Sequence, residues 1–365
     1  MIPYGRHSVN QDDIDAVVRV LKGDWLTQGD NIERFESAVA DYVGVQFAVA
    51  FSSGTAALHG AAWAGGLGPG EIAYTSPLTF MATANAARYL GATPALVDIS
   101  PDTWNIDLRF LPEDADAVLP VHYSGLPVDL AQPGWAKRPR LVIEDAAHAL
   151  GAHTPYGPVG NCSHSDMTVF SFHPVKPITT GEGGLVTTND LEFATRLRRF
   201  RNHGIVRKPE KGGWYYEISE LGFHYRMTDI QAALGYSQLS RLDKFISARN
   251  EIARTYREEL QGLNVQLPPR APSGFAHGYH LFPVVVPNRD KAFDEFHRRG
   301  IRVQVHYVPI HHHPISADVR NAGSTFPEAD KVYKGLLSLP IHPAMTGPQL
   351  SEVVNACHEV FQKSD

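Results

Sequence analysis

Short apolar segments alternate with helix-type patterns over the first half of the chain, and this alternation is what most restricts its fold. The apolar segments span residues 47–51, 95–98, 117–121, 141–144, 167–170 and 185–187. Alternation of this kind is typical of an α/β protein, in which helices cover the faces of a largely parallel sheet. The sequence therefore predicts an α/β fold whose sheet is complete by about residue 190.

Polar residues directly follow three of these segments. Ser53 comes after the first, Asp145 ends the fourth, and Ser171 begins a loop after the fifth that also carries Lys176. Ligands of open α/β sheets bind beyond the carboxyl ends of the strands. We therefore expect these four residues to lie along one rim of the sheet.

Lys176 lies in a segment rich in glycines and hydroxyls, residues 171–184. An amine is a nucleophile only when it is unprotonated, and a lysine at a strand end among small residues is suited to Schiff-base chemistry. The alternative is an ordinary surface lysine.

Two more segments complete a set that suits pyridoxal phosphate (PLP). Asp145 ends an apolar strand, where its carboxylate suits a pyridinium nitrogen. Residues 52–58 read as a polar turn and the start of an Ala-rich helix, where free N–H groups and the helix dipole favour a phosphate. Lysine, acid and anion cradle on one rim indicate a PLP site.

Over nearly its whole length the chain resembles the DegT/DnrJ/EryC1/StrS family of sugar aminotransferases, which have the aspartate-aminotransferase-like fold (fold type I). The matching segments are 3–6, 26–29, 35–36, 53–58, 144–148, 171–184 and 225–235. Segments 165–176, 202–205 and 303–310 are most similar to transaminases of pseudaminic acid biosynthesis. The resemblance implies a large mixed-sheet PLP domain over residues 1–240, a small C-terminal α/β domain over 241–365, and a homodimer with shared active sites.

The resemblance also implies roles for single residues. Lys176 is expected to hold PLP and then to move protons as general base and acid, while Asp145 keeps the ring nitrogen protonated. His148 is similar to a position near the phenolic oxygen of PLP, with a core histidine bonded to backbone as the alternative. Phe80 matches an aromatic residue that stacks on the ring, with simple packing as the alternative. The phosphate candidates are Gly54, Thr55, Ala56 and Ser171.

Substrate contacts are predicted from the same resemblance at Tyr4, Thr27, Arg226, His306 and Tyr307. Arg226 has a planar fork that binds a carboxylate or a phosphate with two bonds.

One position departs from the family pattern. His224 stands where relatives commonly carry an asparagine that reaches the cofactor phosphate of the neighbouring subunit. A histidine donates to a phosphate best when it is charged. The contact is therefore either pH-sensitive or lost.

No metal site is predicted, although His306 and the run 311–313 contain four histidines. Neighbouring residues in an extended loop point in different directions, and zinc sites favour separated ligands.

The implied reaction moves an amino group from L-glutamate to the 4-keto carbon of a UDP-linked 2-acetamido-2,6-dideoxy-hexos-4-ulose, giving UDP-4-amino-4,6-dideoxy-N-acetyl-β-L-altrosamine. Alternatives are a GDP-perosamine type or a dTDP 3- or 4-keto sugar aminotransferase, or a non-catalytic relative that binds PLP. A dehydratase of the same fold has histidine in place of the lysine. A nicotinamide dehydrogenase needs a G-x-G-x-x-G turn between strand and helix, which residues 66–71 do not supply.

Composition narrows the remaining classes. The formal charge of −6 disfavours a nucleic-acid partner. No apolar run has membrane-spanning length, and the polar residues 1–10 do not form a signal peptide. Only two cysteines, Cys162 and Cys357, are present, which fits a reducing cytoplasm.

Several local elements are also predicted. Asn10 should cap a first helix whose apolar stripe includes Ile14 and Leu21. Thr228 and Gln231 form a capping box for a long helix between the two domains. Residues 279–286 and 301–307 read as strands, and 204–213 as an exposed loop.

Overall fold

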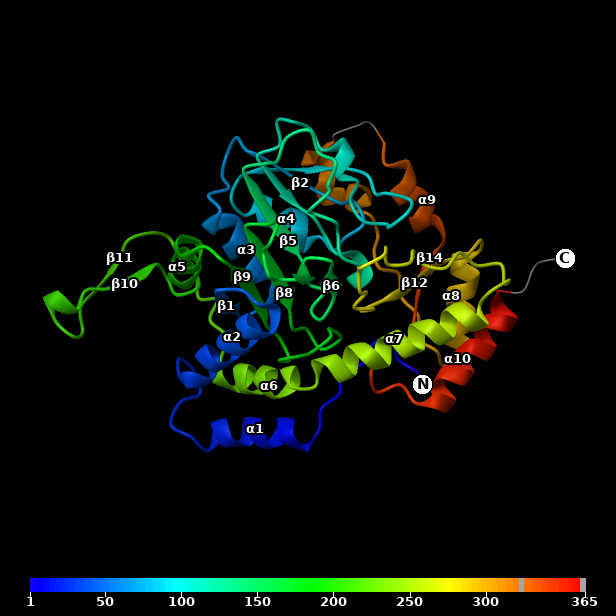
Figure 1. Cartoon of the computed structure of the whole chain (residues 1–365), viewed down its shortest axis with the longest axis horizontal. Helices are drawn as coiled ribbons and strands as arrows, with labels where there is room; N and C mark the ends of the chain where they lie inside the picture. Colours follow the sequence, from blue (N-terminus) through cyan, green and yellow to red (C-terminus); the bar gives the residue numbers. More distant parts are fainter. Residues whose placement is uncertain (322–324, 362–365) are drawn as a thin grey trace.

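The computed structural model describes residues 1–321 and 325–361, and one eight-stranded sheet forms its centre (Figure 1). The strand order is β1-β9-β8-β5-β4-β2-β3-β13. The strands are β1 (Phe47–Phe51), β2 (Ile72–Thr75), β3 (Thr93–Leu96), β4 (Ala117–Leu119), β5 (Leu141–Asp145), β8 (Met167–Ser171), β9 (Gly184–Thr188) and β13 (Arg320–Asn321). The α/β prediction is confirmed, and β2 is a strand that we did not predict.

The direction of the strands brings several carboxyl ends to one edge. β8, β5, β4, β2 and β3 run parallel, whereas β9 is antiparallel to both β1 and β8. β1 therefore points the same way as the parallel strands. Gly184 pairs with Phe51 on one side and with Ser171 on the other, so the ends of β1 and β8 lie close together.

Helices cover both faces of the sheet because alternate residues of a strand point to opposite sides. Phe51 of β1 packs with α3 (Gly54–Ala64), whereas Ala50 packs with α2 (Asp30–Val43). α4 (Ala82–Arg88) and α5 (Leu191–Phe200) lie with α3, and α6 (Asp229–Leu239) lies with α2. α1 (Gln11–Leu21) packs on α6.

A second core forms from the C-terminal third of the chain. β12 (Phe282–Val285) pairs antiparallel with β14 (Leu336–Leu339), and the surrounding helices are α7 (Leu242–Glu259), α8 (Arg289–Arg298) and α10 (Gly347–Val360). Ile2 belongs to this core, since its N–H donates to the carbonyl of Gly300 and its own carbonyl accepts from Arg302. The division at residues 240 and 241 stays a prediction.

Three elements of the structure differ in detail from those predicted from the sequence. The capping box at Thr228 is confirmed, but the helix ends at Leu239, and α7 continues almost in line with it (Figure 1). Residues 204–213 are not only a loop: β10 (Ile205–Arg207) pairs with β11 (Tyr216–Ile218), and the glycine-rich stretch serves as the turn of a projecting hairpin (Figure 1). Residues 301–307 form only isolated bridges, because Ile301 pairs with residue 2 and Gln304 with residue 338.

The first helix docks on a different face from the one predicted. Asn10 caps α1 as expected, but Ile14 and Leu21 are exposed. Asp13 is instead fully buried, where it forms an ion pair with Arg241 and accepts a hydrogen bond from Gln238 at 2.7 Å. A buried carboxylate requires such partners, so this polar network orients the helix together with Ala16 and Val20, which pack against Ala233.

Arg249 of α7 connects the second core to the loop that precedes β12. Its guanidinium is buried and donates to the carbonyls of Tyr279, His280 and Ile341 at 3.2, 3.3 and 2.9 Å. Burial lowers the pKa of Arg249 to about 10, so the side chain stays charged at neutral pH. Within the described residues, no helix is long and apolar enough to cross a membrane.

Replacing Arg249 with leucine should lower the free energy of unfolding by about 3 kcal/mol, because three buried carbonyls lose their donor. Arg254 on the same helix is the control. It is exposed and forms ion pairs with Glu251 and Glu258 on the surface of the helix, so Arg254→Leu should lower the free energy of unfolding far less. Urea unfolding measures both variants, and equal losses would contradict the role assigned to Arg249.

Candidate active site

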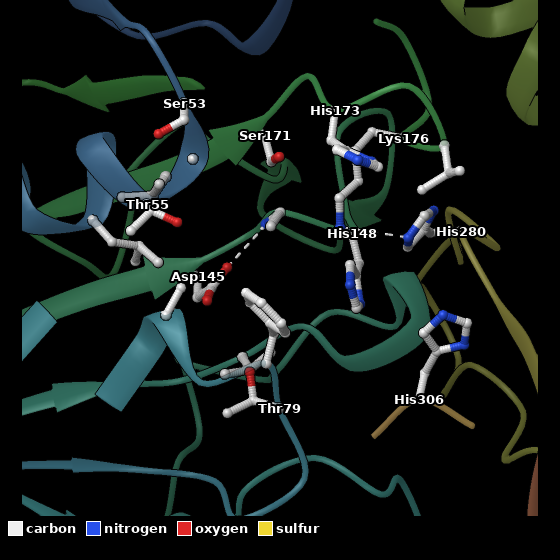
Figure 2. Close-up of a pocket in the computed structure, with 18 of the residues that line it drawn as sticks. Ser53, Thr55, Thr79, Asp145, His148, Ser171, His173, Lys176, His280 and His306 are labelled. Carbon is white, nitrogen blue, oxygen red and sulfur yellow. Dashed lines mark hydrogen bonds between the residues drawn. The ribbon is translucent and has the colours of Figure 1, made fainter. Parts of the chain in front are cut away.

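A cavity of about 400 Å³ opens at the sheet edge where β1, β5 and β8 end (Figure 2). Most of the predicted site residues line it. They are Tyr4, Gly54, Thr55, Phe80, Asp145, His148, Ser171, Lys176, His306 and Tyr307. The topology thus brings together residues from both ends of the chain.

Lys176 follows β8 in a turn where its N–H donates to the carbonyl of His173 at 2.9 Å. The turn is closed by the hydroxyl of Thr179, which donates to the carbonyl of Phe172 at 3.0 Å. Burial lowers the pKa of the Lys176 ammonium to about 8, and the nearby Asp145 carboxylate acts in the opposite direction. A larger fraction of this amine is therefore unprotonated at neutral pH than of an exposed lysine.

Asp145 ends β5 and is 5 % exposed, so its carboxylate depends on hydrogen bonds inside the protein. One oxygen accepts from the hydroxyl of Thr83 at 2.7 Å, and the other accepts from the N–H of Ala147 at 3.1 Å. These bonds hold the carboxylate toward the cavity.

The first turn of α3 forms the anion cradle. Ser53 caps the helix by accepting from the N–H of Ala56 at 3.1 Å. Gly54 lies against Ser171, and an added Cβ would be 2.9 Å from the Ser171 Cβ, so a side chain does not fit there. Gly54 and Thr55 line the cavity at the helix start, where N–H groups have no intrahelical partner.

His148 contacts another side chain rather than backbone. Its Nε2 lies 3.0 Å from the hydroxyl of Tyr307, and its buried Nδ1 has no partner among the described residues. Burial, with the Lys176 charge as a smaller cause, lowers the pKa of His148 well below its ordinary value. Burial likewise lowers the pKa of His306 to about 3. Both imidazoles are therefore neutral.

Phe80 is 61 % exposed at the cavity, with its ring 5.9 Å from that of Tyr307. Such exposure does not fit a simple packing role, and a flat ligand would cover the ring. Its predicted stacking role stays a prediction.

Four predicted site residues lie outside the lining of this cavity. The N–H of Ala56 is bonded to the Ser53 cap, and Thr27 is exposed in the loop before α2. His224 is also exposed and forms a bridge with Asn202, whose side-chain oxygen accepts from Arg226 at 2.5 Å. Within one copy of the chain, these four do not reach the site.

Sequence reasoning missed two residues of the site. His280 lies just before β12, with its Nε2 3.5 Å from the Lys176 amine, and Thr83 is the donor to Asp145. Nothing local marks His280, because it contacts the lysine across 104 positions of the chain. Thr83 carries a weak signal, since a threonine one turn after Thr79 can face the same side of a helix.

The surface histidines are more ordered than predicted. Nε2 of His311 and Nε2 of His312 both lie 2.9 Å from one carboxylate oxygen of Asp330, while His313 contacts the carbonyl of Val308. The ligand atoms of His311, His312 and Asp330 lie within 4.8 Å of one another. α9 (Pro327–Gly335) supplies the carboxylate that the local sequence lacks. The absence of a metal site stays a prediction.

The residues of the cavity fit PLP. The start of α3 offers donors for a phosphate, Asp145 offers a carboxylate for the ring nitrogen, and Lys176 offers a buried amine. The unpartnered Nδ1 atoms of His148 and His280 also indicate a polar ligand in this space. Sheet and cavity together define a PLP-dependent aminotransferase of fold type I.

Comparison with known proteins gives the family. The model of the DegT/DnrJ/EryC1/StrS aminotransferase family matches residues 7–358, and the chain belongs to this family of nucleotide-sugar aminotransferases. The UDP-4-amino-4,6-dideoxy-N-acetyl-beta-L-altrosamine transaminase of Campylobacter jejuni (serotype O:23/36) is 35 % identical, over all of this chain and 98 % of that protein. The GDP-perosamine synthase of Caulobacter vibrioides is 36 % identical over 95 % of each.

Solved structures of sugar aminotransferases are similar to this chain as well. Helicobacter pylori PseC, described as an aminotransferase involved in the biosynthesis of pseudoaminic acid, has a TM-score of 0.89 and 29 % identity, with 99 % of each chain covered. The putative sugar aminotransferase Spr1654 of Streptococcus pneumoniae, in its PLP form, has a TM-score of 0.89 and 26 % identity, with 98 % of each chain covered.

In the chain without PLP, acylation of Lys176 by acetic anhydride should show a midpoint near pH 8, because burial lowers the pKa of its amine to about 8. Asp145→Asn should move the midpoint to lower pH, since it removes a charge that stabilises the ammonium. Peptide mass spectrometry across a pH series measures this, with exposed lysines, which titrate at about 10.4, as internal reference. A Lys176 midpoint equal to theirs would show that the amine is not buried.

Proposed function

We propose that this protein transfers the amino group of L-glutamate to the 4-keto carbon of a UDP-linked 2-acetamido-2,6-dideoxy-hexos-4-ulose, giving UDP-4-amino-4,6-dideoxy-N-acetyl-β-L-altrosamine for pseudaminic acid biosynthesis. The observation that carries an aminotransferase function is the cavity that joins the buried amine of Lys176 to Asp145 and the start of α3. Similarity to the Campylobacter transaminase over the full chain supports the choice of sugar.

The proposed roles follow from these positions. PLP, when bound, supplies an electron sink for the carbon that loses or gains the amino group. Gly54, Thr55 and Ser171 bind its phosphate, and Asp145, held by the hydroxyl of Thr83, keeps the ring nitrogen protonated. Lys176 holds the cofactor and, when its amine is free, takes and returns the proton.

Neutral imidazoles favour an uncharged polar ligand at one wall of this cavity. His148, His280 and His306 are buried, and burial lowers the pKa of each below its ordinary value. They offer hydrogen bonds to hydroxyl, keto or acetamido groups without adding charge. Tyr4 and Tyr307 add further hydroxyls, so a sugar suits this wall better than a second anion does.

The GDP-perosamine type of sugar is the second candidate. The Caulobacter synthase is as similar to the chain as the Campylobacter transaminase, at 36 % against 35 % identity. A change of nucleotide or sugar needs only a change of pocket residues. A relative that binds PLP without turnover is the remaining alternative.

Turnover with L-glutamate against a panel of UDP-, GDP- and dTDP-linked keto sugars, read by mass spectrometry, tests the proposal. We expect amination of the UDP-linked 2-acetamido-4-keto sugar, with kcat/KM at least about tenfold above that for the others, as expected where a buried polar group must be matched. Lys176→Ala is the inactive control. A preference for the GDP-linked 4-keto sugar would replace the proposed substrate, and PLP binding without turnover would favour the non-catalytic alternative.

We also propose a homodimer in which each copy completes the site of the other. Among the described residues that line the cavity, Lys176 is the only lysine or arginine, although a nucleotide sugar carries a diphosphate. His224 and Arg226 lie outside the cavity of their own chain, beside the hairpin of β10 and β11. That hairpin exposes Trp214, Tyr216 and Ile218, an apolar surface that a second copy would cover.

Mixing the inactive variants Lys176→Ala and Arg226→Ala should restore up to about a quarter of wild-type activity, because a hybrid dimer contains one site without either change. The matched control mixes Lys176→Ala with Asp145→Ala. Both of these residues line the cavity of one chain, so no hybrid site escapes both changes. With subunit exchange demonstrated, no recovery in the first mixture would place Arg226 outside the partner's site.

Two further proposals concern the chain as a whole. We propose the predicted domain boundary near residue 240, supported by the separate apolar core around β12 and β14. We also propose a cytoplasmic location, because Cys162 and Cys357 are unpaired and a nucleotide sugar is an intracellular metabolite.

A further inference from the structure

We propose that His280 is a positioning residue for Lys176, whose free amine donates a hydrogen bond to the Nε2 atom of His280 and is thereby held at the cavity wall. This inference rests on the proposed role of Lys176. The two atoms lie 3.5 Å apart, and the contact joins the C-terminal part of the chain to the loop after β8 (Figure 2).

The imidazole of His280 suits an acceptor role. It is 4 % exposed, and its Nδ1 is buried without a partner among the described residues. A neutral imidazole has one donor and one acceptor nitrogen. Because the ammonium form of Lys176 has donors and no acceptor, Nε2 of His280 is the acceptor in this contact and Nδ1 carries the hydrogen.

The surrounding charges keep the ring neutral. Burial is the main cause that lowers the pKa of His280, and the positive charges of Lys176 and Arg249 act in the same direction. The ring centres of His148 and His280 lie 4.4 Å apart. Among the described residues, Asp145 is the carboxylate that acts on the lysine, and it also accepts hydrogen bonds from Thr83 and Ala147.

The backbone at His280 is fixed from three sides. Tyr279 has a φ of 43°, a left-handed conformation that costs energy for a residue other than glycine. The carbonyls of both residues accept from buried Arg249, and the next N–H, of Leu281, donates to Ser124. Gly125 lies so close that an added Cβ would be 3.2 Å from the His280 nitrogen. A residue whose backbone is held in this way can orient a mobile side chain that contacts it.

Lysine needs such an orienting contact more than most residues. Its four-carbon stem has many rotamers, and ordering it costs up to about 2 kcal/mol in conformational entropy. A fixed acceptor favours the rotamers in which the amine stays at the cavity wall, which is the place from which it acts on the substrate. The contact with His280 therefore affects both the position of the free amine and its pKa.

The test is the acylation titration of Lys176 in the full-length chain without PLP, applied to variants of His280. His280→Phe keeps the ring but removes the acceptor. Because an acceptor stabilises the ammonium form, its loss should move the midpoint to lower pH by about one unit, a tenfold change in the protonation equilibrium. His280→Gln, whose side-chain oxygen reaches about as far as Nε2, should restore the midpoint to near the wild-type value.

His297→Phe is the matched control. It makes the same substitution in the C-terminal part, on α8, where the imidazole bonds to the carbonyl of Val303 rather than to a site residue. In this variant the acylation midpoint of Lys176 should equal that of wild type. If His280→Phe does not fold, as judged by near-UV circular dichroism, the comparison of His280→Asn with His280→Gln replaces it, since the asparagine amide is too short to reach the amine.

Two outcomes overturn the proposal. Equal Lys176 midpoints in wild type and the acceptor-free variant would show that Nε2 does not hold the amine. A midpoint in His280→Gln as low as in the acceptor-free variant would show that the ring acts by packing alone. Neither outcome depends on turnover, so a failure of the proposed reaction is recognised separately by the substrate panel.

Discussion

The buried guanidinium of Arg249 is the interaction on which the position of the loop carrying His280 depends. It reaches from α7 to carbonyls in two separate segments, at residues 279–280 and at residue 341. Burying a guanidinium is costly, so it is favourable only where fixed acceptors surround it. The same bonds that satisfy the arginine therefore fix the loop carrying His280, and through it one wall of the cavity. The bonds of Arg249 therefore contribute both to the packing of the C-terminal core and to the geometry of the cavity wall.

The edge of the sheet that holds the cavity could be predicted because strand direction alone determines it. Ser53, Asp145 and Ser171 are each at or just after the end of an apolar segment, and parallel strands bring such positions to one side. The register of β1, β9 and β8 then places the first and last of them together. This part of the prediction needs no knowledge of side-chain packing. Lys176 could be predicted at the same edge because it lies in the loop directly after β8.

The rest depends on contacts between distant residues, which no local pattern records. His280 reaches the lysine because Arg249, a residue of α7, holds its backbone carbonyl. The face of α1 that docks on the protein carries the buried carboxylate of Asp13, whose partners lie more than 200 positions later in the chain. His311 and His312 turn to one carboxylate because α9 brings it there. In each case a polar group requires a partner, and that requirement prevails over the apolar pattern.

The position of the first residues has a consequence for how the molecule is made. Ile2 packs in the C-terminal core, and the carbonyl of Tyr4 accepts from the N–H of Ile341. Gly300, Arg302 and Ile341 are synthesised long after residues 2–4, so this segment has no docking site until they have been made. Tyr4 lines the cavity beside His306, with their ring centres 5.0 Å apart. The wall of the cavity that Tyr4 forms therefore closes late in folding, and a polypeptide that stops before Gly300 leaves that side of the cavity open even though β1 to β9 are already synthesised.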